Sequence, residues 1–228
     1  MDLMTRAVSA PFEVGSAIRH ARIFHPHGAL FDGTAHFDRD FGPVPGGEPL
    51  PVRARLSRGI GTPRQLPDIL GLAVRVRLPA GPWDLLFATA YLPARVALVP
   101  ARTWASARYS TLVPYRTADD RSPRWLTATP QGAQPTGSAA IDDLAAPLSF
   151  AVHLAARGAP VPAGRIHLEH RLPSDDSVQP SFDPVLNCPP GLEMWPTWLA
   201  KLRRTAYAGS RKGREAVGAR DPERGGAL

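Results

Sequence analysis

Proline and glycine interrupt this chain so often that long helices are improbable through most of it. The 228 residues include 26 prolines and 20 glycines, and both residue types break helices. The segments between them are short and rich in Val, Leu and Ile, a composition that favours strands. We therefore expect strands to dominate the first two thirds of the chain.

Several of these short segments alternate apolar and polar residues with the period of a half-buried strand. In PVRARLSR (51–58), Val, Ala and Leu alternate with Arg, Arg and Ser, and GLAVRVRL (71–78) repeats the pattern. Segments 83–92, 148–156 and 164–172 continue it. Their spacing is typical of an antiparallel sheet that closes on itself, so we predict a β-barrel.

The remaining segments are predicted to flank the barrel. Residues 116–141 are dominated by Pro, Ser, Thr, Gly and Asp, which indicates a long surface excursion. A helix is predicted after Pro196, because TWLAKLRRTAYA places Leu199, Arg203 and Tyr207 at i, i+4 and i+8. The polar sequence after Gly209 is expected to fray.

Length and composition favour one globular domain, with 43% apolar and 21% charged residues. We divide the chain into an N-terminal arm (1–18), a single domain (19–214) and a polar, disordered tail (215–228). The single Cys188 excludes an intramolecular disulfide. No apolar run reaches the roughly 20 residues of a membrane helix, and the first residues lack a secretory apolar stretch. We expect a cytoplasmic protein with no membrane partner.

The formal charge of +7 comes almost entirely from arginine. Such an excess is compatible with nucleic acid, anionic lipid or a small anionic ligand. Asp221 and Glu223 dilute the arginine-rich tail, so we expect no nucleic-acid partner.

Four motifs give the pattern a more specific meaning. SFDPVLNCPPGLE (181–193), followed by Arg203-x-x-x-Tyr207, resembles the haem catalase family, whose proximal haem ligand is a tyrosine on such a helix. ARIFHPHGA (21–29) resembles its distal segment, with Arg22 three residues before the essential histidine, here His25. VRARLSRGIG (52–61) resembles the strand with Arg-apolar-Ser, and PDILGLAVRVRLPAGPWDLL (67–86) follows in order.

This resemblance, which covers about residues 19–214, implies an α+β fold. An antiparallel catalase-type barrel would carry flanking helices, with haem b between the barrel and the C-terminal helix. Tyr207 would ligate the iron as the anion, and Arg203, one helical turn earlier, would supply the cation that a tyrosinate needs near neutral pH.

The resemblance also assigns the other haem contacts. Arg22, Arg55 and Arg214 stand where the family places arginines that pair with the haem propionates. His25 would take a proton from hydrogen peroxide and return it to the departing oxygen, a role suited to a pKa of about 6.5. The Ser57 hydroxyl would hold His25 in one tautomer.

Two positions near the haem depart from the family pattern. Ala88 stands where catalases have a distal asparagine, between Phe87 and Thr89, which become candidate pocket residues. Losing a positioned donor at a reacting oxygen costs on the order of 100-fold in rate. Phe24 replaces a small aliphatic residue before the distal histidine. The chain is also short for the family, so we expect a smaller oligomer, such as a homodimer.

We therefore expect a haem peroxidase or catalase-like oxidoreductase with weak catalase activity. Its partners would be hydrogen peroxide or an organic peroxide and a second, unidentified small organic substrate. Two alternatives stay open. One is a repurposed haem enzyme that rearranges or dehydrates an organic substrate, as the catalase-like allene oxide synthases do. The other is a non-enzymatic protein that binds or senses haem.

Overall fold

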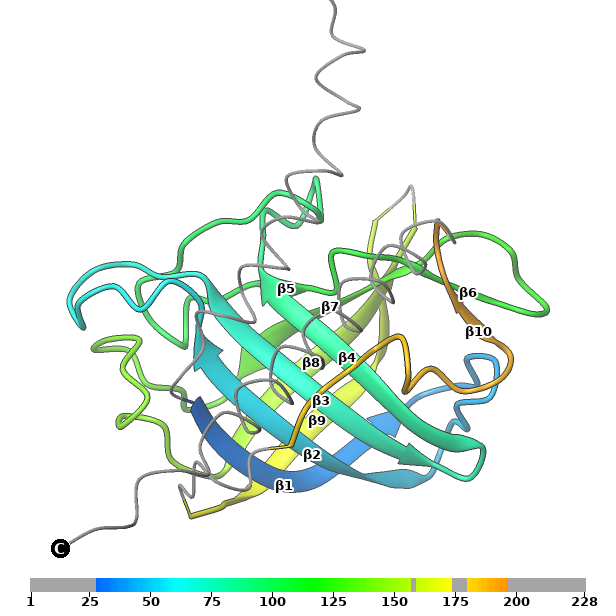
Figure 1. Ribbon diagram of the computed structural model, residues 1–228, viewed down its shortest axis with the longest axis horizontal. Helices are drawn as coiled ribbons and strands as arrows, with labels where there is room; N and C mark the ends of the chain where they lie inside the picture. The colour runs from blue at the N-terminus through cyan, green and yellow to red at the C-terminus, as the bar shows by residue number, and fades with distance from the viewer. Residues whose placement is uncertain (1–27, 157–158, 174–179, 197–228) are drawn as a thin grey trace, which may run out of the picture.

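Eight antiparallel strands close into a barrel in the computed structural model, which describes residues 28–156, 159–173 and 180–196 (Figure 1). A separate two-stranded sheet lies beside it. The barrel strands, in hydrogen-bonded order, are β1 (Gly28–Phe37), β2 (Pro49–Arg58), β3 (Leu70–Leu78), β4 (Gly81–Thr89), β5 (Tyr109–Ser110), β7 (Trp125–Gln131), β8 (Leu148–Ala155) and β9 (Val161–Arg171). The second sheet pairs β6 (Tyr115–Thr117) with β10 (Leu192–Met194).

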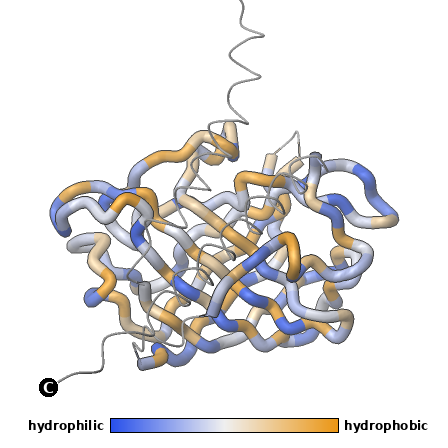
Figure 2. The backbone as a smooth tube through the Cα atoms, viewed as in Figure 1, coloured by the Kyte–Doolittle hydropathy of each residue, from blue (hydrophilic) through white to orange (hydrophobic). Residues whose placement is uncertain are grey.

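The alternation seen in the sequence sorts side chains between the barrel interior and its outer wall. Along β3, Leu72, Val74 and Val76 are fully buried, whereas Arg75 and Arg77 point the other way. Figure 2 shows the same alternation of hydropathy along the strands. The interior is a packed apolar core with Phe31, Phe150 and other large side chains almost fully buried.

Closure between the first and last strands depends on two glycines, Gly33 on β1 and Gly164 on β9, where a Cβ would lie 2.1 Å from the carbonyl oxygen of His36. The β1–β9 register shifts by one residue between Asp32 and Gly33. A Cβ at Gly33 would lie 2.0 Å from the carbonyl oxygen of His167, so no other residue lets the two strands come this close.

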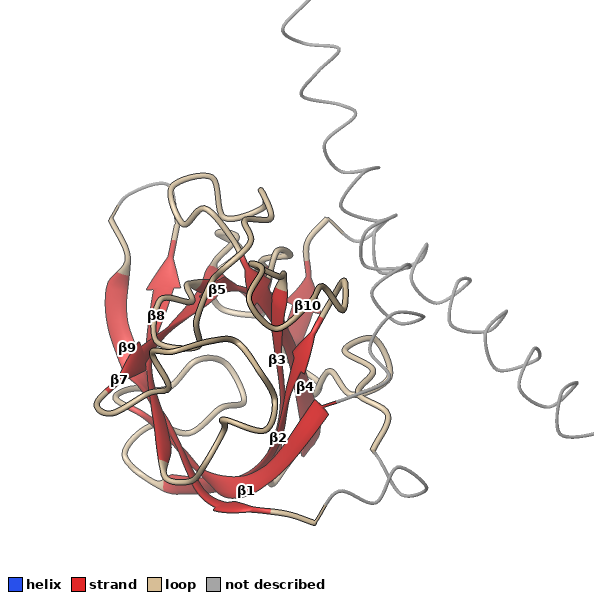
Figure 3. Ribbon diagram, turned by 90° about the vertical axis from the view of Figure 1, so that its left-hand side faces the viewer, coloured by secondary structure: helices blue, strands red, loops and turns tan. Residues whose placement is uncertain are grey.

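Loops close one mouth of the barrel, as the view in Figure 3 shows. They connect β2 to β3 (59–69), β4 to β5 (90–108) and β7 to β8 (132–147). Buried Trp104 donates its indole N–H to the carbonyl oxygen of Ala140 at 2.8 Å, and the N–H of Ala105 bonds to Pro135. At the other mouth, Trp83 packs edge-on against Tyr115 of β6, with ring centroids 5.4 Å apart.

The barrel prediction is confirmed, and the five segments predicted as strands coincide with β2, β3, β4, β8 and β9. The prediction for residues 116–141 is partly wrong, because β7 lies inside that segment and completes the barrel. The loops in this segment are 118–124 and the loop after β7, which begins at residue 132 and continues to residue 147. β7 is not apparent in the sequence because Pro130 lies inside it and the segments around it are rich in Pro, Gly and Ser.

The predicted arm (1–18), the helix after Pro196 and the tail (215–228) lie outside the described residues. Within the described ranges there is no helix, and hence none that could span a membrane.

Candidate functional site

The outer face of β1–β4 carries a row of very small side chains. Strand register places Gly28 opposite Ser57, Ser57 opposite Gly71, and Gly71 opposite Ala88. With a strand spacing of about 4.8 Å, this row spans about 15 Å. Two predicted positions, Ser57 and Ala88, therefore lie on one face with a glycine between them.

The neighbouring row on the same face is apolar apart from one arginine. Leu30 faces Arg55, and Arg55 faces Ala73, whose partner on β4 is Leu86. The guanidinium of Arg55 extends over Gly28, because a Cβ at Gly28 would lie 2.7 Å from the Arg55 Cζ atom. The glycine thus leaves the room that the predicted propionate-binding arginine occupies.

A third row is charged, with two arginines between two aspartates. Asp32 pairs with Arg53 across β1 and β2, Arg53 faces Arg75, and Arg75 pairs with Asp84 across β3 and β4. Arg53 donates to both carboxylate oxygens of Asp32 at 2.8 and 2.9 Å, and this hydrogen bonding lowers the pKa of Asp32. Arg75 binds both oxygens of Asp84 at 2.7 Å.

The chain returns across this third row and is fixed there by Asp84, whose side chain is fully buried. One Asp84 oxygen accepts the backbone N–H of Asp183 at 2.6 Å and the side-chain amide of Asn187 at 2.8 Å. Arg75 donates to the carbonyl oxygen of Ser181 at 2.7 Å and lies 5.3 Å from the Phe182 ring. We call Arg75, Asp84, Asp183 and Asn187 the strand clamp.

The strand clamp is a part of the site that sequence reasoning did not identify. Asp84 and Asn187 are 103 residues apart, so no local spacing relates them. A signal was present nevertheless, because both residues belong to the motifs of the resemblance, WDL and FDP-x-x-Asn. The contact ties those two motifs together on the outer face of the barrel.

Two of the predicted pocket residues do not share this face. Phe87 points into the barrel and is 3% exposed, as a member of the apolar core. Thr89 also points inward, and its hydroxyl accepts the backbone N–H of Leu70 at 3.1 Å. Adjacent residues of a strand point to opposite faces, so the structure separates both from Ala88 and Ser57.

The other predicted site residues lie outside the described ranges: Arg22, Phe24, His25, Arg203, Tyr207 and Arg214.

The described residues indicate what kind of group this outer face could hold. The row has no side chain larger than serine and lies beside Leu30 and Leu86, so it forms a flat, mostly apolar face with the cation of Arg55 at its edge. Leu30 and Ser57 on this face are buried. A planar apolar ring with anionic substituents, such as haem, suits that donor set. Among the described residues, no three His, Cys, Asp or Glu side chains gather as a metal site.

Cys188 lies in the segment that the strand clamp fixes, where a thiolate would be an alternative iron ligand. Burial raises the pKa of its thiol to about 11, with a smaller contribution from Glu193. The thiol lies 3.5 Å from the carbonyl oxygen of Leu192, in hydrogen-bonding range. Cys188 is therefore a packed, protonated thiol near neutral pH.

The fold is that of catalases. The chain is similar to catalase A from Saccharomyces cerevisiae, with a TM-score of 0.62 and 12% identity over 82% of this chain and 59% of that one. A fungal catalase matches with a TM-score of 0.62 and 10% identity over 82% and 58% of the two chains. A bacterial catalase gives 0.59 and 15% over 84% and 57%. The chain thus spans less than three fifths of each catalase.

At these identities the likeness establishes a catalase-like barrel and nothing finer. No protein-family model and no curated protein matches the sequence.

Proposed function

We propose that this chain is a haem-dependent oxidoreductase of reduced catalase-like architecture, with haem b held against the outer face of β1–β4. The observation that carries the proposal is the placement of Arg55, Ser57 and Ala88 on one outer face of a catalase-like barrel. The motifs of the resemblance predicted all three as residues near the haem, Arg55 as a propionate partner and Ser57 and Ala88 on the distal side.

Each residue would have a separate task. Tyr207 would hold the iron as a tyrosinate, and Arg203 would stabilise its negative charge. Arg55, with Arg22 and Arg214, would pair with the propionates. Bound haem would supply the electrons and the Lewis acidity needed to break a peroxide O–O bond.

Proton transfer would fall to the chain itself. His25 would accept the proton of the peroxide oxygen that approaches the iron and deliver it to the oxygen that leaves. The Ser57 hydroxyl would fix the tautomer of His25, because a hydrogen bond at one ring nitrogen determines which nitrogen can act as the base. Two residues, Pro26 and His27, separate His25 from Gly28, the first residue of the small-side-chain row.

Ala88 favours peroxidase chemistry over rapid catalase turnover. Its methyl group cannot donate to a peroxide oxygen, whereas an amide there would polarise the departing oxygen. The rate of oxygen release should therefore be low, and oxidation of a small organic reductant should compete with it. The lack of an amide at position 88 also favours a second candidate function, rearrangement or dehydration of an organic hydroperoxide, which needs no external reductant.

Haem loading tests the first part of the proposal. The full chain, expressed with a haem precursor, should show the absorbance spectrum of ferric haem on a tyrosinate. Tyr207→Phe should lose most of the haem, and Tyr91→Phe, whose side chain is 58% exposed, should keep it. A colourless wild type, or a fully loaded Tyr207→Phe, would refute the proposed site.

Peroxide reactivity tests the second part. His25→Ala should keep its haem and react with hydrogen peroxide about 100-fold more slowly, the usual size of a general acid–base contribution. His170→Ala, an exposed histidine on β9, is the matched control. Oxygen release, reductant oxidation and reductant-free conversion of a fatty-acid hydroperoxide distinguish catalase, peroxidase and rearrangement activity. If the bound haem is inert in all three assays, the chain is a haem-binding protein and not an enzyme of these classes.

A further inference from the structure

Exposed apolar side chains gather in two loops at one mouth of the barrel. Of the six large apolar side chains that are most exposed in the described chain, four belong to loops 59–69 and 90–108. They are Ile60 (59% exposed), Leu66 (52%), Tyr91 (58%) and Val99 (42%). We call these four residues, with Arg64 and Arg102, the loop rim.

Backbone hydrogen bonds hold the two loops together as one surface. Asp68 and Ala101 exchange both N–H···O bonds, at 3.0 and 2.8 Å, and Ile60 donates its N–H to the Asp68 carboxylate. Val99 bonds to Thr89 at the end of β4. The loop rim is therefore a fixed edge of the barrel, and its apolar side chains are displayed by an ordered backbone.

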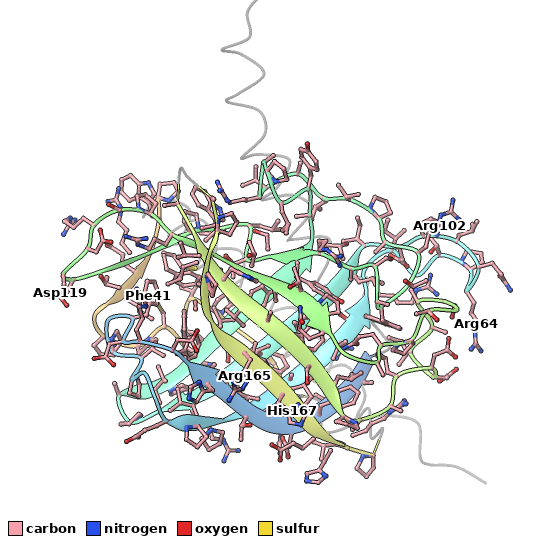
Figure 4. The ribbon with its side chains drawn as sticks, turned by 180° about the vertical axis from the view of Figure 1, so that it is seen from behind. Phe41, Arg64, Arg102, Asp119, Arg165 and His167 are labelled. Carbon is pink, nitrogen blue, oxygen red and sulfur yellow. The ribbon has the colours of Figure 1, made fainter. Side chains whose placement is uncertain are left out.

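The loop rim has a positive surface. Loops 59–69 and 90–108 contain four arginines and a single carboxylate, Asp68. Asp68 is fully buried and pairs with Arg58 at 3.3 Å. Arg64 pairs with Asp142 and Asp143 of the third loop, at 3.6 and 3.2 Å, so the positive charge of this end comes from the other arginines, Arg95, Arg102 and Arg108. Arg102 is exposed and lies at the same end of the molecule as Arg64 (Figure 4).

Isolated exposed apolar residues need no explanation, but a cluster of them on a charged edge marks an interaction surface. A second copy of the chain fits poorly, because a two-fold contact would bring the same arginines face to face. The complementary surface must carry negative charge and accept protruding aliphatic and aromatic side chains. An anionic lipid surface offers both, since Tyr and aliphatic groups enter the interface while arginines pair with headgroups.

We propose that the loop rim docks this protein on an anionic lipid surface. Such a contact needs no spanning segment, so it is compatible with a cytoplasmic protein, although it departs from the expectation of no membrane partner. It is independent of haem and would hold for a haem-free chain.

Vesicle binding of the full chain tests the proposal. The protein should co-sediment with phosphatidylcholine vesicles that contain phosphatidylserine, bind phosphatidylcholine alone far more weakly, and dissociate as salt is raised. Arg102→Glu should lower the apparent affinity about tenfold, since each charge near the surface contributes several-fold. The double variant Tyr91→Ser/Val99→Ser should lower it by about the same factor, because it removes inserted apolar area.

Two variants on other parts of the surface control for charge and apolar area. Arg121→Glu makes the same charge change at an exposed site between β6 and β7, and Leu186→Ser removes a side chain that is 57% exposed. Both should bind as the wild type does. All variants change exposed side chains, so their thermal unfolding should match the wild type.

Four results would overturn the proposal. The first is no binding to the anionic vesicles, and the second is equal loss in the rim and control variants. The third is loss in Arg102→Glu with none in Tyr91→Ser/Val99→Ser, which would mean adsorption by charge alone. The fourth is equally tight, equally variant-sensitive binding of poly-glutamate, which would make the rim a site for an acidic polypeptide.

Discussion

The wall made by β1–β4 and the wall made by β8 and β9 pack their inner faces into one core, but their outer faces differ. On the first wall two outer rows hold Gly, Ser, Ala and Leu with Arg55, a third row holds two Asp–Arg pairs, and the fully buried carboxylate of Asp84 is covered by the returning chain. On the second wall the outer positions hold Arg165 and His167 (Figure 4), and Glu169 follows on the same strand. The two rows of small and apolar side chains give part of the first wall an apolar outer face that a solvated sheet would not need.

The polar wall satisfies its side chains locally. Ser149 and His167 face each other across β8 and β9, with the hydroxyl and Nδ1 2.7 Å apart, and Thr34 donates to Glu169 at 3.2 Å. Nothing on this wall ties down a distant segment of the described chain through a buried charge. The outer face of β1–β4 is therefore suited to be covered by other groups, whereas the outer face of β8 and β9 is suited to face water.

The largest effect is expected from removing the Asp84 carboxylate, which holds the returning segment against the first wall. Asp84→Asn leaves Arg75 without its counter-charge and turns an amide toward the donors of Asp183 and Asn187. We expect a loss of about 3 kcal/mol in the free energy of unfolding, as for a broken buried pair. Denaturant titration measures it.

Glu169→Gln is the matched change on the other wall, where the carboxylate is exposed. It should cost less than about 0.5 kcal/mol. Equal losses for the two variants would show that the returning segment does not depend on the strand clamp.

The next test concerns activity and rests on the proposed function. Ala88→Asn adds an amide to the outer face of β4 beside the small-side-chain row, and we expect oxygen release per haem to rise about tenfold or more. Ala151→Asn makes the same change on the outer face of β8 and should leave oxygen release unchanged. No gain in Ala88→Asn would mean that position 88 does not approach the peroxide.

The sequence predicts the two walls unequally, for a physical reason. The period-2 pattern finds β2, β3 and β8 because each alternates cleanly between core and exterior. It does not find β5, which has only two residues. It weakens at β1, which carries two glycines. Strands that are very short are specified by their neighbours, and a local pattern cannot show that.

The same alternation governs the site. Arg55 and Ser57 are two residues apart on β2, so their common face follows from the sequence. The period also separates Phe87 and Thr89 from Ala88, and applying it to β4 would have removed both from the pocket. The strand clamp has no local signal in the sequence, because Asp84 and Asn187 are 103 residues apart.

A smaller effect is expected at Gly28, the glycine of the first wall that makes room for the Arg55 side chain. In Gly28→Ala the new Cβ would overlap the guanidinium, which is the mobile end of a long side chain and can move aside. Stability should hardly change, whereas haem affinity should fall about tenfold if Arg55 pairs with a propionate, since a charge-assisted hydrogen bond contributes about 1.5–3 kcal/mol. Titration of the apoprotein with haemin measures it.

Gly137→Ala is the control for this change, because a Cβ there meets no atom within 4 Å. Its haem affinity should equal that of the wild type. Unaltered affinity in Gly28→Ala as well would place the haem propionates away from Arg55.

The smallest effect compares two ion pairs within the charged row of the first wall. Asp32–Arg53 has the same bidentate geometry as Asp84–Arg75, but its side chains are 38% and 37% exposed. Solvent screening should reduce its contribution to about 0.5 kcal/mol at neutral pH.

The hydrogen bonds from Arg53 lower the pKa of Asp32 below its ordinary value of 3.8. A carboxyl with a lowered folded-state pKa stabilises the fold above its unfolded-state pKa, and that stabilisation disappears as the pH falls through the folded-state value. Asp32→Asn should therefore be slightly less stable than the wild type at pH 7, and the two should converge below about pH 4. Asp142→Asn, at an 82% exposed side chain, should show no such convergence because it starts with no difference. If Asp32→Asn instead costs as much as Asp84→Asn, pairing across the strands would account for the stability of this row, and the covering segment would contribute little.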